Sequence, residues 1–128
     1  MNPGLESIDH LVLTVADISA TENFYARVLG VPTITFGQNR RALQIGTQKI
    51  NLHQAGKEFE PKALQPTPGA ADLCFLSAYP LADWLSHLAR CGVDVIDGPV
   101  MRTGAQGAIE SIYIRDLDGN LIEIANQK

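Results

Sequence analysis

Polar and apolar residues alternate along residues 8–15, and this alternation is typical of a strand that turns one face toward a core. Apolar residues then recur at helical spacing over residues 18–29, and Gly30 follows as a helix stop. Either Asp17 or Ser19 can cap the start of this helix. The pattern therefore predicts a strand followed by a helix.

The second half of the chain repeats this order. A strand-like run covers residues 71–77, and the helical pattern that follows it stops at Gly92. The spacing that separates Gly30 from Gly92 also lays His10 on Asp72 without a gap. A match of this kind across strand and helix indicates an internal duplication.

Three further strand-like runs follow each helix, so each half has the order β-α-β-β-β. These runs cover residues 32–37, 41–46 and 49–54 in the first half, and residues 93–98, 110–115 and 120–125 in the second half. A longer connection, residues 98–108, separates two strands of the second half. When the last strands are aligned across this connection, His53 falls on Glu123.

We therefore predict an α+β protein in which two tandem βαβββ modules form curved mixed sheets. The chain of 128 residues has the length of one domain. Module one covers about 6–55 and module two about 70–127. The segment between them, about 56–69, contains three prolines and is expected to be a linker.

Composition excludes several classes of partner. A net charge of −4 gives no broad basic field for nucleic acid or for a membrane surface. No apolar run approaches the length of a membrane span, and no leader pattern opens the chain, so we expect a cytoplasmic protein. The two cysteines, Cys74 and Cys91, are too few for a disulfide framework or a zinc knuckle, and core packing is the simplest interpretation.

Four metal-capable residues stand at matched places in the repeat: His10 and Asp72 on first strands, and His53 and Glu123 on last strands. All of them alternate with apolar residues, so they are expected to face a concave cleft. Imidazoles and carboxylates suit a divalent Zn, Ni, Mn, Co or Fe ion with free positions for substrate oxygens. Such an ion can stabilise an enediolate or an oxyanion, and Glu123 is the expected catalytic residue.

Four other polar residues are expected to orient the substrate. Arg102 lies in the glycine-rich connection and can close over an oxygen-rich ligand, while Asn51, Tyr113 and Arg115 lie on strands near the predicted site. Simpler explanations stay open. Arg115 can pair with Asp116 or Asp118, and Arg102 can be solvent-exposed.

The order of three stretches, IDHLVLTV, FYARVLGV and IRDLDGNLIEI, resembles the vicinal oxygen chelate (glyoxalase/bleomycin resistance/dihydroxybiphenyl dioxygenase) superfamily. The runs ALQIGTQKINLHQAGKEFEPKA and GPVMRTGAQGAIESIYIRDLDGNLIEI look most like the glyoxalase domain-containing protein 5 subgroup. The resemblance implies that His10 and Glu123 are metal ligands. Glyoxalase I has a carboxylate where this alignment places His53 and a histidine where it places Asp72, so the two types look exchanged.

The resemblance also implies a homodimer in which each site joins the first module of one subunit to the second module of the other. The expected function is a divalent-metal-dependent lyase or isomerase that acts on a small molecule with vicinal oxygens, with dioxygenase or transferase activity less favoured. The alternatives are a metal-free protein that sequesters a drug or metabolite, as bleomycin-resistance proteins do, and a structural interaction module.

Overall fold

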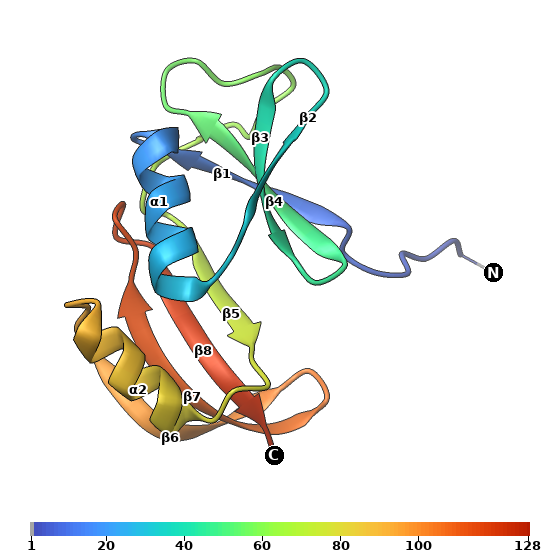
Figure 1. Cartoon of the computed structure of the whole chain (residues 1–128). Helices are drawn as coiled ribbons and strands as arrows, with labels where there is room; N and C mark the ends of the chain where they lie inside the picture. Colours follow the sequence, from blue (N-terminus) through green and yellow to red (C-terminus); the bar gives the residue numbers. More distant parts are fainter. Residues whose placement is uncertain (1) are drawn as a thin grey trace.

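The computed structural model describes residues 2–128 and has two modules, each with one helix and one four-stranded sheet (Figure 1). The first module contains β1 (His10–Val15), α1 (Ile18–Leu29), β2 (Thr33–Phe36), β3 (Arg40–Ile45) and β4 (Gln48–Gln54). The second contains β5 (Asp72–Leu76), α2 (Leu81–Arg90), β6 (Asp97–Gly104), β7 (Gly107–Arg115) and β8 (Leu121–Gln127). The expected α+β fold of two tandem βαβββ modules is confirmed.

Both sheets have the same connectivity. The strand orders are β1-β4-β3-β2 and β5-β8-β7-β6, and in each sheet the first strand pairs in parallel with the last. The other neighbours pair antiparallel, so both sheets are mixed. Residues that lie opposite each other on paired strands share a face of the sheet.

Capping fixes the ends of α1. The side chain of Asp17 accepts a hydrogen bond from the backbone N–H of Ala20 at 3.0 Å, so Asp17 rather than Ser19 is the N-cap. At the other end Gly30 has a φ of 67°, a left-handed conformation that glycine adopts without steric cost. The helix then buries Phe24, Tyr25 and Val28 against the sheet.

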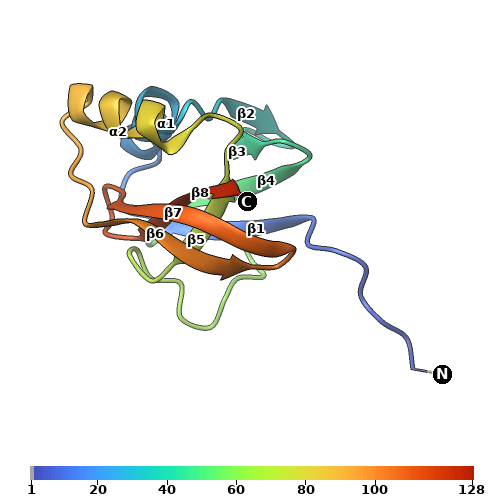
Figure 2. The same ribbon diagram turned by 90° about the horizontal axis from the view of Figure 1, so that it is seen from below.

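Both helices lie on one side of the molecule and the linker lies on the opposite side (Figure 2). One hydrophobic core runs through both modules beneath the helices. Its largest buried members are Tyr25, Leu43, Leu52, Leu88, Ile112, Ile114, Ile122 and Ile124. Each fully buried aliphatic side chain contributes about 1.5–3 kcal/mol, so the helix-facing side of each sheet is fixed by burial. The polar strand positions are left on the opposite face.

One expected strand was wrong. Residues 93–96 form no strand, and β6 begins at Asp97 and continues through the segment that the sequence suggested was a connection. The edge position of β6 tolerates Pro99, and the register shifts between Asp97 and Val100. Gly98 has a φ of 93°, and a Cβ there would lie 2.3 Å from a backbone oxygen of β7. Arg102 therefore lies on a strand rather than in a loop.

The strand register also corrects the alignment of the two last strands. Leu11 lies opposite Ile50, and its repeat equivalent Leu73 lies opposite Ile122. Ile50 and Ile122 are therefore equivalent, and the next residue on each strand pairs Asn51 with Glu123. The expected match of His53 with Glu123 was wrong, because the repeat places His53 on Ala125.

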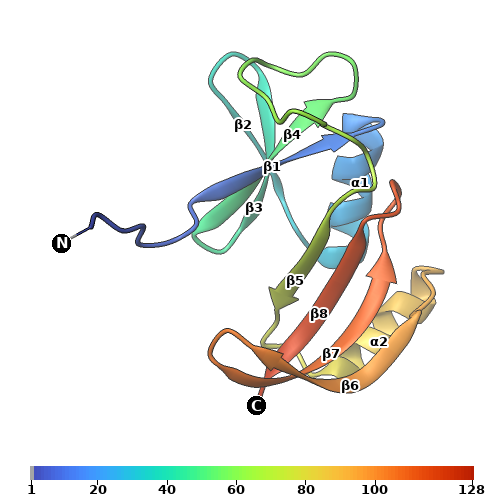
Figure 3. The same ribbon diagram turned by 180° about the vertical axis from the view of Figure 1, so that it is seen from behind.

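A buried hydrogen bond joins the two modules. The hydroxyl of Tyr25 on α1 donates to Asp116 Oδ2 at 2.6 Å, and the other carboxylate oxygen accepts the backbone N–H groups of Asp118 and Asn120. Burial, followed by the charge of Asp116, raises the pKa of the Tyr25 hydroxyl, so it remains a donor. The carboxylate thus holds the β7–β8 turn against α1, and Figure 3 shows α1 beside this turn. Within residues 2–128, neither helix has the length and apolar character needed to cross a membrane.

We expect Tyr25→Phe to lower the free energy of unfolding by about 1.5–3 kcal/mol, because it removes a buried hydrogen bond to a carboxylate. Urea titration at pH 7 measures this change. Tyr79→Phe is the matched control, since Tyr79 is 70% exposed and its loss of a hydroxyl should leave stability unchanged. Equal stability of the two variants would show that the contact does not hold the modules together.

Candidate functional site

The second sheet gathers most of the predicted site residues. A hollow of about 500 Å³ on the face away from α2 is lined by Asp72, Arg102, Tyr113, Arg115 and Glu123, together with Asp97 and two apolar neighbours, Ile96 and Leu121. A second hollow, of about 550 Å³, adjoins Glu123 on the side of Cys74. Glu123 therefore borders both hollows, as expected for the central residue of this face.

The carboxylate of Glu123 is held in place from β7. The hydroxyl of Ser111, which is fully buried, donates to Glu123 Oε2 at 2.6 Å. Cys74 lies opposite Glu123 on β5. Cys74 is exposed, so the expectation that it packs in the core was wrong. Partial desolvation of its thiol still raises the pKa to about 11, and the Glu123 carboxylate adds to this shift. The thiol therefore stays protonated at neutral pH and is not a nucleophile here.

The two arginines of this hollow have different partners. Arg102 Nε donates to the hydroxyl of Tyr113 at 3.0 Å, and its guanidinium lies 3.7 Å from a carboxylate oxygen of Asp97. Arg115 Nη1 donates to the carbonyl of Gly119 at 3.3 Å, so its partner in the turn is a backbone oxygen. Both guanidinium groups retain donors for a ligand.

The first sheet places Asn51 at the position equivalent to Glu123. Asn51 is 5% exposed, and its Oδ1 is buried with no hydrogen-bond partner in the structure described for residues 2–128. A buried acceptor without a donor costs about 1–3 kcal/mol. This oxygen is therefore poised for a donor or a cation that approaches the face opposite α1.

His53 is buried two residues further along β4, with 3% of its surface exposed. Its Nε2 lies 3.3 Å from Arg40 Nη2, and the ring of Phe59 meets the imidazole edge-on at 5.7 Å. Burial, followed by the charge of Arg40, lowers the pKa of His53. The neutral imidazole accepts the Arg40 hydrogen bond through Nε2, which places its proton on Nδ1.

Sequence reasoning missed Arg40, although a signal for it existed. The residues of β3 and β4 that flank the Gly46–Thr47 turn pair in register, and this register sets Arg40 opposite His53 on the same face. Pairing the residues of β3 and β4 outward from the turn would have placed Arg40 next to His53. The alternation of polar and apolar residues within each strand does not show this neighbour.

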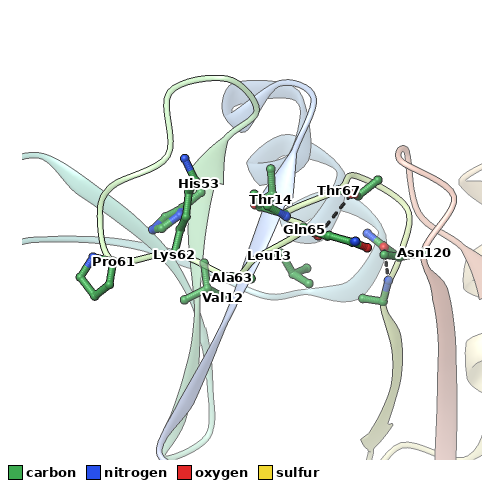
Figure 4. A pocket seen from close by; sticks show the side chains of 13 residues that line it. Val12, Leu13, Thr14, His53, Pro61, Lys62, Ala63, Gln65, Thr67 and Asn120 are labelled. Atoms are coloured by element: carbon green, nitrogen blue, oxygen red, sulfur yellow. Dashed lines mark hydrogen bonds between the residues drawn. The ribbon is translucent and has the colours of Figure 1, made fainter.

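A pocket of about 360 Å³ lies between the first sheet and the linker (Figure 4). His53 lies at one end and Asn120 at the other, with Thr14 between them, and the linker supplies Lys62 and Gln65. The amine of Lys62 already pairs with Glu60 at 3.0 Å. Most of the other lining residues are apolar, among them Val12, Leu13 and Pro61, so the pocket combines an apolar lining with a few polar groups.

The four predicted metal ligands do not meet in one chain. On the parallel ladder His10 lies opposite Lys49 and His53 lies opposite Thr14, so their attachment points are about 13 Å apart. His10 is exposed and pairs with Asp9 at 2.8 Å. No group of three His, Cys, Asp or Glu side chains within residues 2–128 is arranged to hold a metal ion.

Residues 7–124 match the family described as the Glyoxalase/Bleomycin resistance protein/Dioxygenase superfamily, and the chain belongs to it.

Two relatives align over almost the whole chain. Virulence protein STM3117 of Salmonella typhimurium is 60% identical over 121 residues, which cover 94% of this chain and 84% of that protein. Glyoxalase domain-containing protein RDO1 of Mycosarcoma maydis is 56% identical over 122 residues, which cover 95% of this chain and 69% of that protein. The crystal structure of the Salmonella protein has a TM-score of 0.95 at 58% identity and covers 98% of this chain and 100% of that chain.

More distant structures share only the fold. A lactoylglutathione lyase of Agrobacterium tumefaciens has a TM-score of 0.71 at 21% identity, covering 96% of this chain and 95% of that chain. At this identity the likeness establishes the architecture and carries no information about activity.

The contact of Glu123 with Cys74 makes a chemical prediction. In Glu123→Gln, the thiol loses a neighbouring charge, and its alkylation by iodoacetamide at pH 8 should become roughly three- to tenfold faster, which corresponds to a pKa lower by about half a unit to one unit. Mass spectrometry of the peptide that contains Cys74 measures the rate. Glu110→Gln, which removes a carboxylate from the other face of β7, should leave the rate unchanged. A rate that is insensitive to Glu123→Gln would contradict the contact.

Proposed function

We propose that this protein is a metal-dependent enzyme of the glyoxalase type, whose sites form between the first module of one subunit and the second module of another. The observation that carries the proposal is the buried, unpartnered Oδ1 of Asn51 at the position equivalent to Glu123. An unpaired oxygen on a face that also presents His10 suits a cation supplied with further oxygen ligands.

Charge supports the pairing of the two faces. The positions of the first sheet that face away from α1 carry His10, Arg40, Lys49 and His53 and no carboxylate. The corresponding face of the second sheet carries Asp72, Asp97 and Glu123, and its two arginines are partly engaged by Tyr113, Asp97 and a backbone carbonyl. A basic face and an acid-rich face favour association of two copies in this orientation.

The donor set fits a divalent metal when the two faces meet. His10 and the amide oxygen of Asn51 come from one subunit, and the carboxylates of Asp72 and Glu123 come from the other, which gives one imidazole and three oxygen ligands. This set replaces His53, which is occupied by Arg40, with Asn51. A metal bound there supplies Lewis acidity toward two adjacent substrate oxygens.

The residues of the chain itself have separate tasks in this proposal. Glu123, oriented by Ser111, takes up a proton from the substrate at its carboxylate. Arg102, Tyr113 and Arg115 line the hollow beside it and orient the substrate through their remaining donors. A lyase or isomerase that moves a proton next to two oxygens requires these parts. Within the family, the runs quoted above favour the glyoxalase domain-containing protein 5 subgroup.

A metal-free protein that sequesters a metabolite is the second candidate. The observations in its favour are the pocket beneath the linker and the lack of three gathered ligands in one chain over residues 2–128. Metal analysis of protein purified without chelator or nickel affinity separates the two candidates.

We expect the wild type to retain a divalent metal at close to one ion per chain, and His10→Ala or Glu123→Gln to lose at least about nine-tenths of it, because each removes a ligand. Inductively coupled plasma mass spectrometry provides the measurement. Glu110→Gln is the matched control, since Glu110 pairs with Lys128 on the other face. Retention of the metal by both variants would contradict the assignment of His10 and Glu123 as ligands.

Mixing the two variants tests whether the sites are shared between subunits. In a mixed dimer, the first module of the Glu123→Gln subunit and the second module of the His10→Ala subunit are both intact, so one complete site forms. We expect a coexpressed, purified heterodimer to recover about half of the wild-type metal content. Sites built within single chains would each carry one defect, and the heterodimer would then remain empty.

A further inference from the structure

Arg40 and Lys49 are two cations without a counterion on the face of the first sheet away from α1. The guanidinium carbon of Arg40 lies 5.1 Å, and the amine of Lys49 lies 3.4 Å, from the centre of the Phe36 ring. Both charges are therefore within a Debye length, about 8 Å at physiological salt, of the same point. Neither has an ion pair with a carboxylate of residues 2–128.

Arg40 is held rigidly rather than left to move in solvent. Its guanidinium lies over Phe36 and also over Phe59, whose ring centre is 4.7 Å away, and its Nη2 is bonded to His53. Glu58, next to Phe59, accepts the backbone N–H of Gly56 and forms no ion pair with Arg40. These contacts cover part of the guanidinium, which is half-buried, and favour one orientation of its N–H groups.

Arg40 and Lys49 are positive groups to which an anion can bind. Two cations share one aromatic ring, and a guanidinium packed against aromatic rings gains from an anionic acceptor that takes its fork of donors. The strand register sets how far this anion would lie from the proposed metal ligands. Arg40 lies opposite His53 on the neighbouring strand. His53 is two residues from Asn51 along β4, so the backbone positions of His53 and Asn51 are about 7 Å apart.

We propose that Arg40 and Lys49 form a subsite for an anionic oxygen group on the substrate, a carboxylate or a phosphate. This inference rests on the proposed function, since the same substrate would present its vicinal oxygens at the level of Asn51. The substrate is then a small organic acid or phosphate ester that also carries two adjacent oxygens. His53 is a positioning residue, because its lone pair holds Arg40 in place.

Calorimetric titration of the metal-depleted full-length protein tests the subsite. The probes are succinate and inorganic phosphate, with succinamide as the uncharged match for succinate. We expect binding of at least one anion, no binding of succinamide, and an affinity at least about tenfold weaker in Arg40→Gln and in Lys49→Gln. Arg40→Lys keeps the charge but loses the fork and should recover part of the affinity. The anion that binds more tightly, succinate or phosphate, indicates whether the substrate is an organic acid or a phosphate ester.

Arg90→Gln is the matched control, because it removes the same charge from the exposed end of α2 and should change nothing. Absence of binding by both anions, or equal affinity in wild type and Arg40→Gln, overturns the subsite.

Sedimentation of the same variants checks the other source of an anion, a carboxylate of the second subunit. Dimers that weaken in Arg40→Gln while anion affinity is unchanged would make Arg40 an interface residue. Arg40-dependent binding in a protein that never retains metal would refute the proposed enzyme and leave the subsite standing.

Discussion

The parallel pairing of the first strand with the last strand in each sheet determines where every polar group of the candidate site lies. Because side chains alternate between the two faces of a strand, burial of Leu13 and Leu52 beneath α1 forces Asn51 and His53 to the other face. The same pairing in the second module places Glu123 and Cys74 side by side. A slip of one residue on either ladder would exchange the core with the site, and the free energy of the buried face prevents it.

The junction between the modules depends on polar contacts at its edge. Tyr25 reaches from the first module to Asp116 in the second, and Asp118 accepts the backbone N–H of Ala16 in the segment after β1. These bonds sit beside a core that already runs through both modules. The β7–β8 turn is thus tied to α1.

Periodicity was sufficient to predict the architecture, because strands and helices with one buried face carry their period in the sequence. It was insufficient for β6, whose residues Gly98 and Pro99 look like a loop and are tolerated only because the strand is at an edge. It was also insufficient for the last strands. A repeat alignment across an insertion can slip by a whole alternation and still match apolar residues with apolar residues, and this slip exchanged Asn51 for His53.

The grouping of Asp72, Tyr113, Arg115 and Glu123 in one hollow follows from their alternation on adjacent strands, which is visible in the sequence. Arg102 joins them because β6 continues through the segment that the sequence suggested was a connection. Arg40 was not visible in this way, since its importance comes from contacts with Phe36, Phe59 and His53, and these residues lie on three different segments. Side-chain contacts between segments depend on register and on the path of the linker, and neither is encoded in local periodicity.

The hydrogen bond between Arg40 and His53 distinguishes two functions, metal ligation and anion binding. The sequence analysis had assigned His53 to metal ligation. A histidine that ligates a metal needs its lone pair for the metal, and in His53 that lone pair faces a guanidinium at 3.3 Å. A cation at the same nitrogen would meet the positive charge of Arg40 in a poorly hydrated setting, where like charges repel strongly. An anion beside Arg40 meets no such penalty. The row of residues at His53 therefore favours anions, and the neighbouring row at Asn51, with its unpaired oxygen, favours cations. A ligand that carries both kinds of partner, oxygens for a metal and a negative charge on the same molecule, matches the two rows together.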